Sequence, residues 1–262
     1  MNDERPFADL NEHLPALAKY PVLLSFAEWF LGLRRIREVF AKSASAENPA
    51  ATVVEQLDLT VRLDGLENEI PAEGPVVIAA NHSHGGTDAI ALASKCIELR
   101  KDTLILANAE LMRLPGISRF LLPVNILSDE NVTAENMTAL RTMLKHVRAG
   151  GALVVFPAGR VAYWQQGEIK DPPWNDHVVT LMSRMKATVV PVWFFGGVPV
   201  YLQILAALSG FLRTAFIPKG LVAMTGGEIT GRVGKSFHSD VLKNNGTRWL
   251  RKYLEGLRDL GN

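Results

Sequence analysis

Cysteine, basic clusters and long apolar segments are scarce in this chain of 262 residues, and each scarcity excludes a class of protein. The single cysteine, Cys96, excludes an intrachain disulfide framework and a cysteine-rich zinc site, and it suits a reducing compartment. The formal net charge is only +1 and there is no polybasic block, so we expect no nucleic-acid partner. Because 48% of the residues are hydrophobic, we expect a folded protein with one main core and an appendage.

The N-terminal region contains no apolar run that is long enough to span a membrane. Residues 1–15 are acidic where a signal peptide is basic, so we expect them to remain uncleaved. The apolar stretch 20–33 would reach roughly 21 Å as a helix, which is short of the roughly 30 Å hydrocarbon core of a bilayer. Trp29 and Phe30 in this stretch, followed by basic residues, favour an amphipathic helix at the membrane interface. A helix that packs on the protein core is the alternative.

Helical and strand-like patterns alternate along most of the chain. The predicted strands are at 76–80, 152–157 and 187–195, and the predicted helices between them are at 88–99, 134–148 and 175–185. This alternation indicates an α/β fold with a largely parallel central sheet flanked by helices. The small and polar residues 43–52 predict a linker, which divides the chain into an N-terminal helical segment, 1–50, and a main domain, 51–262. Residues 200–213 form a second apolar helical patch, either core or membrane-facing.

Residues that can carry chemistry follow directly after the strand at 76–80, in the sequence NHSHGGTD. In an open α/β sheet, ligands bind where strands end and helices begin, which favours a functional role for His82. A histidine can take a proton from a hydroxyl, and an aspartate bonded to its other nitrogen fixes the tautomer and stabilises the imidazolium. Asp88 lies close enough in sequence to be that partner. Gly85 and Gly86 allow a tight turn and leave room for a substrate.

Several alternatives to a His82 and Asp88 pair stay open. His82 can simply bond a backbone carbonyl at the strand end, and His84 is a second candidate for the base. A metal bound by both histidines and Asp88 is a further reading, but the spacing is not zinc-like and we expect no metal. The segment HGGT resembles an esterase oxyanion loop, yet no Gly-x-Ser-x-Gly elbow accompanies it. We expect Cys96 to be buried packing rather than a nucleophile.

Three segments resemble, in order and spacing, the motifs of the glycerolipid (lysophospholipid) acyltransferase family, which includes 1-acylglycerol-3-phosphate acyltransferases. They are GLENEIPAEGPVVIAANHSHGGTD, FPAGR at 156–160 and VVPVW at 189–193, and the likeness extends over about residues 55–240. The five residues between His and Asp, the Phe-Pro-Ala-Gly motif and a later Asp-x-x-Trp, Asp171 to Trp174, are more similar to a divergent branch. That branch contains hemolysin-like and lyso-ornithine lipid acyltransferases.

This resemblance implies the fold of the family and an O-acyltransferase activity. A fatty acyl group would pass from acyl-CoA or acyl carrier protein to the hydroxyl of a lyso-lipid or related polar acceptor, with no further cofactor. His82 would be the general base and Asp88 its orienting partner. The substrate-binding residues that the resemblance implies are Ser83, His84, Gly85, Gly86, Phe156, Pro157, Gly159 and Arg160. The enzyme would sit peripherally on the cytoplasmic side of a membrane.

The chain also departs from the family pattern. Ala158 replaces the usual Glu of the third motif, and RFLLPVNIL lacks the Arg that helps to hold a phosphate, which argues against a glycerol-phosphate acceptor. The alternative for Arg160 is a place on the surface, in a turn between strand and loop. Asp171 and Trp174 can close one wall of the acyl or acceptor pocket, or Trp174 can be an ordinary core residue. A membrane-associated lipid-binding protein without catalysis, and an acyl thioesterase or esterase, are the alternative functions.

Overall fold

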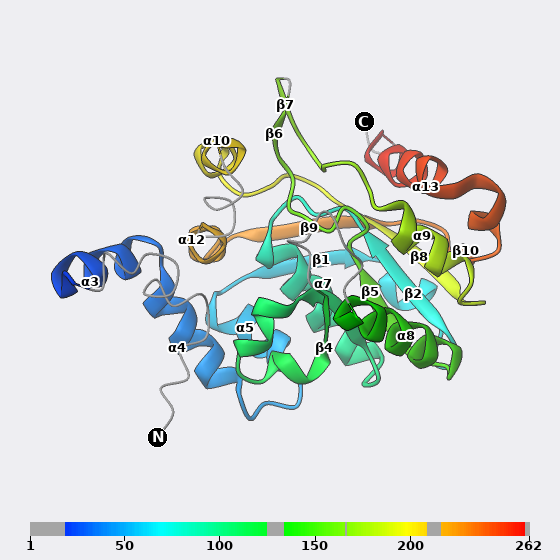
Figure 1. Cartoon of the computed structure of the whole chain (residues 1–262), viewed down its shortest axis with the longest axis horizontal. Coiled ribbons are helices and arrows are strands. Elements are labelled where there is room, and N and C mark those ends of the chain that lie inside the picture. Colours follow the sequence, from blue (N-terminus) through cyan, green and yellow to red (C-terminus); the bar gives the residue numbers. More distant parts are fainter. Residues whose placement is uncertain (1–18, 125–133, 166, 209–215, 260–262) are drawn as a thin grey trace.

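The computed structural model describes residues 19–124, 134–165, 167–208 and 216–259, and its main feature is one central sheet (Figure 1). The strands are β1 (Thr60–Asp64), β2 (Val76–Ala80), β3 (Leu104–Asn108), β4 (Leu121–Val124), β5 (Ala152–Val155), β6 (Tyr163–Gln165), β7 (Glu168–Lys170), β8 (Thr188–Phe194), β9 (Glu228–Val233) and β10 (Phe237–His238). Within the described ranges the central sheet has the order β1-β9-β8-β2-β5-β3-β4, with β10 paired to β8. Strands β6 and β7 form a separate hairpin.

The sheet is largely parallel. Strands β8, β2, β5, β3 and β4 run in one direction, with Ile78 of β2 opposite Val154 of β5 and Val190 of β8. Strands β1 and β9 are parallel to each other, and β9 joins the rest by pairing antiparallel to β8. The predicted α/β fold with a largely parallel sheet flanked by helices is therefore confirmed.

Helices cover both faces of the sheet and bury the alternating side chains of its strands. They are α3 (Pro21–Phe30), α4 (Leu33–Ser43), α5 (Pro49–Gln56), α6 (Leu66–Glu69), α7 (Gly86–Leu99), α8 (Ala134–Arg148), α9 (Asp176–Ser183), α10 (Val200–Leu208), α12 (Ile217–Ala223) and α13 (Val241–Asp259), with short 3-10 turns η1 (Ala109–Arg113) and η2 (Ile117–Phe120). Ile78 packs with residues of α4, α5 and α7, whereas Val77 and Ala79 pack with residues of α8, α9 and α13. This two-sided burial explains why β2 reads as a continuous apolar run.

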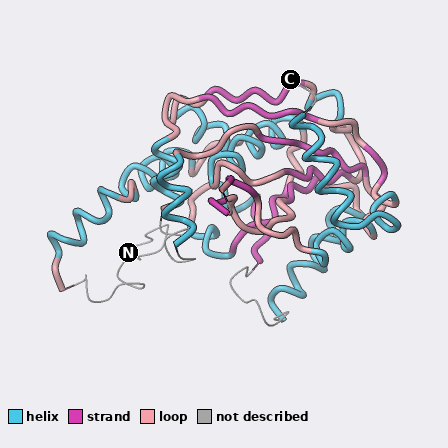
Figure 2. Tube along the Cα trace, turned by 90° about the horizontal axis from the view of Figure 1, so that it is seen from above, coloured by secondary structure: helices cyan, strands magenta, loops and turns pink. Residues whose placement is uncertain are grey.

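The N-terminal helices differ in part from the sequence prediction. The apolar stretch 20–33 breaks after Phe30, and Gly32 adopts φ +75°, a conformation that favours glycine, with the Val222 side chain packed closely against it. Both views show these helices projecting at one end of the molecule (Figures 1 and 2). Residues 49–56, partly assigned to a linker, form α5, since the Asn48 side chain caps it and Pro49 occupies its first turn. The division of the chain near residue 50 stays a prediction.

Other element boundaries were predicted less well. Helix α7 begins at Gly86 rather than after a Thr87 cap, because the Asp88 carboxylate in its first turn bonds the amide of His84. The strand-like segment 221–234 begins as the end of α12, and only β9 is a strand. The β6–β7 hairpin was not expected from the sequence. The predicted patch 200–213 is helical as far as Leu208, and its remainder lies outside the described residues.

Candidate active site

The segment between β2 and α7 forms a tight turn at the carboxyl end of the parallel strands. Asn81, the first residue of the turn, is buried and bonds β8 twice: its Nδ2 donates to the Phe194 carbonyl (3.1 Å), and its Oδ1 accepts the Phe194 amide (2.6 Å). Gly85 closes the turn with φ +66° and ψ −129°, a conformation that side chains with a Cβ rarely adopt. These contacts hold the His82 and Asp88 side chains in fixed relative positions.

His82 and Asp88 form the predicted pair. Nδ1 of His82 lies 2.8 Å from Oδ1 of Asp88, and Oδ2 of Asp88 accepts the backbone N–H of His84 at 2.8 Å. The Asp88 side chain is fully buried, while the His82 side chain is 15% exposed. A carboxylate can only accept, so the shared proton sits on Nδ1 and Nε2 of His82 carries the free lone pair. This is the tautomer that a general base requires.

The electrostatics of the pair favour the charged imidazole. Burial of His82 opposes protonation, but the negative charges of Asp88 and Asp171, with the hydrogen bond to Asp88, outweigh it and raise the pKa of His82 above its usual value. Burial lowers the pKa of His84, so this second imidazole is kept neutral. The two histidines, two residues apart, therefore occupy opposite electrostatic environments.

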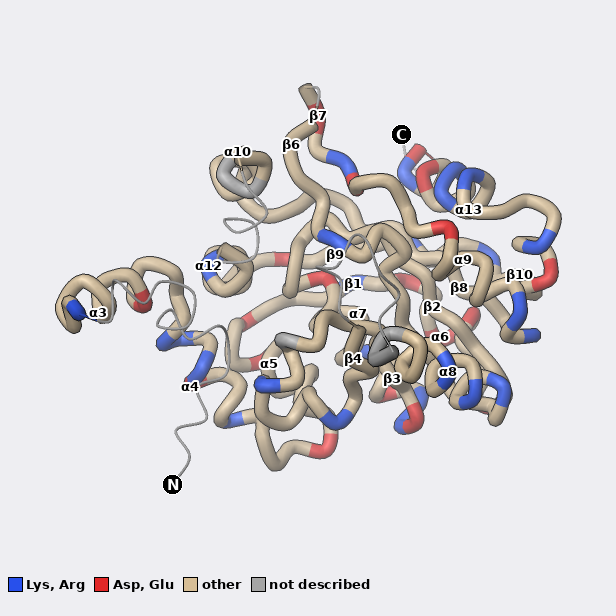
Figure 3. The backbone as a smooth tube through the Cα atoms, viewed as in Figure 1, with Lys and Arg blue, Asp and Glu red and all other residues tan. Residues whose placement is uncertain are grey.

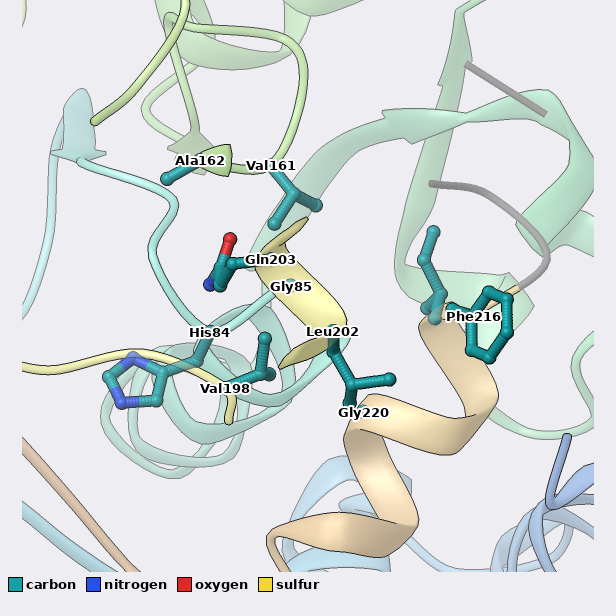
Figure 4. Close-up of a pocket in the computed structure, with 10 residues that line it drawn as sticks. His84, Gly85, Val161, Ala162, Val198, Leu202, Gln203, Phe216 and Gly220 are labelled. Carbon is teal, nitrogen blue, oxygen red and sulfur yellow. The ribbon is translucent and has the colours of Figure 1, made fainter. Parts of the chain in front are cut away.

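His84 is placed differently from a base. Its Nδ1 lies 3.0 Å from the Ser83 hydroxyl, its ring meets Phe194 edge-on, and its Nε2 lies beside the backbone of Gly196. In Figure 4 its ring lies at the margin of the group of lining residues, on the side away from Phe216. The imidazole of His82 thus bonds a carboxylate, whereas the imidazole of His84 bonds a hydroxyl.

The FPAGR segment packs directly against the turn that carries His82. The Phe156 ring stacks on the His82 imidazole, with ring centroids 4.4 Å apart. The Pro157 carbonyl accepts the Asn175 amide (2.8 Å), and Gly159 closes a turn back onto the Phe156 carbonyl (2.9 Å). Arg160 is half-buried just beyond this turn, two residues before Ala162, whose amide donates to the His82 carbonyl at 2.7 Å.

A narrow pocket of about 30 Å³ opens beside the turn, between α10 and α12 (Figure 4). His84 and Gly85 of the turn line it, and its other residues are mostly apolar, including Val161, Leu202 and Phe216. Ile217 and Leu221 fill the space that a side chain at Gly86 would need. The buried Gln203 donates through Nε2 to the Ser83 carbonyl at 3.3 Å. Gln203 therefore joins the turn to α10, on the wall of this mostly apolar pocket.

Several residues that hold this site were not predicted from the sequence. Asn81, Ala162 and Gln203 make contacts with backbone groups far away in the sequence. Asn81 lies within the motif NHSHGGTD, but its bonds to β8 are a tertiary feature, and no local motif marks Ala162 or Gln203. Asp171 and Trp174 were predicted to close one wall of the pocket, with a core position as the alternative for Trp174, but no contact with His82 was predicted for either. Cys96 is buried in the core as expected, and burial raises the pKa of its thiol far above the usual range, which suits packing rather than nucleophilic attack.

The fold and the site together define a class of protein. The family model described as Acyltransferase matches residues 60–195, about half of the chain, and this range contains the His82 and Asp88 pair and the FPAGR segment. The chain belongs to the Acyltransferase family, as the sequence resemblance predicted.

The chain is also similar to individual proteins of known name and to a solved structure. The chain is 33% identical over 148 residues to Lyso-glycine lipid O-acyltransferase of Phocaeicola vulgatus, and 31% identical over 149 residues to the protein of the same name from Bacteroides thetaiotaomicron. Each alignment covers 55% of this chain, which spans about half the length of these relatives (50% and 51%). The crystal structure of the 1-acyl-sn-glycerophosphate acyltransferase PlsC from Thermotoga maritima superposes with a TM-score of 0.50 and 19% identity. That superposition covers 92% of this chain and 97% of PlsC, and it supports the fold.

Proposed function

We propose that this chain is a lyso-lipid O-acyltransferase in which His82 is the general base. The observation that carries the proposal is the 2.8 Å contact between Nδ1 of His82 and the buried Asp88 carboxylate, at the carboxyl end of the parallel strands. Nε2 of His82 takes the proton of the acceptor hydroxyl as its oxygen attacks the thioester carbonyl carbon. The tetrahedral intermediate then collapses, the C–S bond breaks, and the thiolate leaves with the proton from the imidazolium.

The glycine-rich turn supports the same chemistry. Oxyanion stabilisation is often worth about 10²–10³ in rate when amide donors face the developing charge. The amides at Gly85 and Gly86, at the N-terminus of α7, are the candidates next to His82. Arg160 and Ser83 complete the proposed substrate contacts, and the passage between α10 and α12 would widen to admit the acyl chain.

The first test measures thiol release together with lipid product. Purified chain is given acyl-CoA or acyl carrier protein thioester, with and without a lyso-glycine lipid, and the lipids are analysed by mass spectrometry. We expect free thiol and acylated lipid only when both donor and acceptor are present. Thiol without acceptor would indicate a thioesterase, and no thiol with either donor would indicate a lipid-binding protein.

The acceptor is proposed to be an amino-acid lyso-lipid rather than a lysophosphatidate. The named relatives support this choice over half of their length. The composition of the site also supports it, because Arg160 is the one cation of FPAGR. The one arginine of RFLLPVNIL, Arg119, is not at the position of the family's second-motif arginine, and its guanidinium bonds the backbone carbonyls of Ala46 and Glu47. Lysophosphatidate serves as the matched acceptor in the same assay.

We further propose that helices α3 and α10 rest on a membrane surface. Their exposed side chains are large and apolar, with Trp29 64% exposed on α3 and Leu208 69% exposed on α10. Phe30 of α3 contacts Phe216 next to α12, which brings this surface to the mouth of the pocket. Charged residues are sparse over α3 and α10 and dense over α8 and α13 (Figure 3). None of the helices within the described ranges has the length and apolarity needed to cross a membrane.

Flotation with anionic liposomes tests this surface. Phe26→Glu combined with Trp29→Glu places two charges on the exposed side of α3 and should abolish recovery in the lipid fraction. Met137→Glu, an exposed residue of α8, should float like the parent chain. Substitutions are preferable to removal of residues 1–45, because α4 contributes Ile36 and Phe40 to the core. Equal recovery of all three proteins would remove α3 from the membrane surface.

The proposed cellular setting follows from the proposed chemistry. Acyl-CoA and acyl carrier protein are the two donors considered, and we place the enzyme peripherally on the cytoplasmic side of the membrane. The assay above, run with each donor separately, decides between them.

A further inference from the structure

Asp171 is a half-buried carboxylate that the proposed reaction does not use, although it touches the proposed base. Its Oδ1 and Oδ2 lie 3.2 and 3.4 Å from the backbone nitrogen of His82, which donates to them. Its Oδ2 also accepts the indole N–H of Trp174 at 3.1 Å. The residue lies between β7 and α9, 89 positions beyond His82 in the chain, so this contact joins two separate parts of the fold.

Contacts with Trp174 and with Arg251 restrict the position of Asp171. Trp174 is buried, and it packs in the cluster that fills the sheet face under α8, α9 and α13. On the other side a guanidinium nitrogen of Arg251 in α13 lies 3.5 Å from the Asp171 carbonyl. A half-buried carboxylate that accepts from two N–H donors, those of His82 and Trp174, keeps a defined orientation.

Two carboxylates from different segments of the chain thus bond His82. Asp88, from α7, bonds the imidazole, and Asp171 bonds the backbone amide of the same residue. The carbonyl of His82 is held as well, by the amide of Ala162. Rotation of the peptide groups flanking His82 would break at least one of these bonds, so Nε2 is aimed by the backbone as well as by the side chain.

We propose that Asp171, oriented by Trp174, is a positioning residue that fixes the His82 backbone and sustains the basicity of its imidazole. The inference rests on the proposed function, because it assumes that His82 is the base. It is a separate claim, since His82 can act as base whether or not Asp171 contributes.

The charge of Asp171 contributes in a definite direction. Burial raises the pKa of Asp171, while the charge of His82 and the N–H donors of His82 and Trp174 counteract that rise. In return, the Asp171 charge is one of the influences that raise the pKa of His82. Removing the charge therefore lowers the pKa of His82 and weakens the base.

Further titratable and charged groups surround His82 and Asp171. His82 bonds Asp88 of α7 and contacts the uncharged ring of Phe156. His84 lies on the same turn, and Arg160 lies in the loop that follows Phe156. Behind Asp171 a groove of about 340 Å³ is lined by the charged residues Glu168, Lys170, Arg251, Glu255 and Arg258. Within this set, Lys170 pairs with Glu168 and Arg251 with Glu255.

The deciding experiment compares pH profiles and steady-state constants of the full chain and three variants. Asp171→Asn keeps the shape of the side chain and removes its charge, and Asp176→Asn, on the exposed start of α9, is the matched control. We expect Asp171→Asn to lower kcat by about 10- to 100-fold with little change in KM, because the base is misaligned rather than the substrate lost. We also expect the acid limb of kcat/KM against pH to move to lower pH.

Trp174→Phe removes only the indole donor and covers the case in which Asp171→Asn does not fold. It should lower kcat several-fold in the same direction, with KM unchanged. A folded Asp171→Asn protein with parental kcat and an unmoved acid limb would overturn the inference, as would a variant that loses only thermal stability. If Asp171→Asn cannot be folded, parental kcat in Trp174→Phe overturns it instead. Loss of activity in His82→Ala together with a parental Asp171→Asn protein would leave the proposed function standing and reject this inference alone.

Discussion

Replacement of His82 by alanine is expected to lower the rate of acyl transfer by about 10²–10⁴-fold, the range that a positioned general base contributes. The reason is geometric: the imidazole is the group bonded to the buried Asp88 carboxylate, and Phe156 stacks on its ring. The loss should appear in kcat, because the alcohol can still bind when its proton has no acceptor. Steady-state transfer from acyl thioester to lyso-lipid, measured at several acceptor concentrations, separates kcat from KM.

His177→Ala is the matched control for this substitution. His177 is an exposed histidine on α9, and its backbone amide donates to the Asn175 side chain. The control should keep parental activity. If His82→Ala retained activity within a few-fold of the control, His82 would not be the base, and His84 would have to be tested in its place.

Conversion of Asp88 to asparagine should cause a loss on the order of 10²–10⁴-fold, close to that of removing the base. Asp88 accepts from two groups, the His82 ring and the His84 amide. An asparagine has one acceptor oxygen and one donor nitrogen. With its oxygen on the His84 amide, its nitrogen donates to Nδ1 of His82 and drives the ring proton to Nε2, which then cannot accept the proton of the alcohol.

The pH dependence of the Asp88→Asn protein has a definite sign. In the parent the pKa of His82 is raised, despite burial, by Asp88 and Asp171, and the base works only above that pKa. The acid limb of kcat/KM therefore lies at higher pH than for an ordinary histidine, and loss of the Asp88 charge moves it to lower pH. Asp240→Asn, an exposed surface residue, should leave the limb in place. An Asp88→Asn enzyme with full activity and an unmoved limb would contradict the pairing.

The sheet and the His82 and Asp88 pair were predictable because their determinants are local. The apolar run Val76–Ala80 and the six-residue step from His82 to Asp88 are contained in one stretch of chain. Helix α8 and strand β8 were likewise recognisable, from helical spacing and from a continuous apolar run.

The rest of the site depends on contacts that no local pattern reports. Gln203 lies on α10 and reaches the Ser83 carbonyl across 120 residues of sequence, and Asn81 reaches Phe194 across 113. Helix α5 was partly read as linker because Pro49 and Asn48 are common both in turns and at the start of helices. Phe156 and Gly159 were predicted from the resemblance to contact substrate. In the structure the Phe156 ring stacks on His82 and the Gly159 amide bonds the Phe156 carbonyl, and the stacking depends on the tertiary fold rather than on a local pattern.

The backbone of the turn from Asn81 to Ser83 has nearly all its restraints in the second half of the protein. They come from Ala162, Asp171, Phe194 and Gln203. All four lie later in the sequence than strand β2 and helix α7, so the conformation of this turn cannot be fixed until the chain has been synthesised beyond residue 203. A fragment that ends before residue 162 would carry both His82 and Asp88 but none of these four backbone restraints.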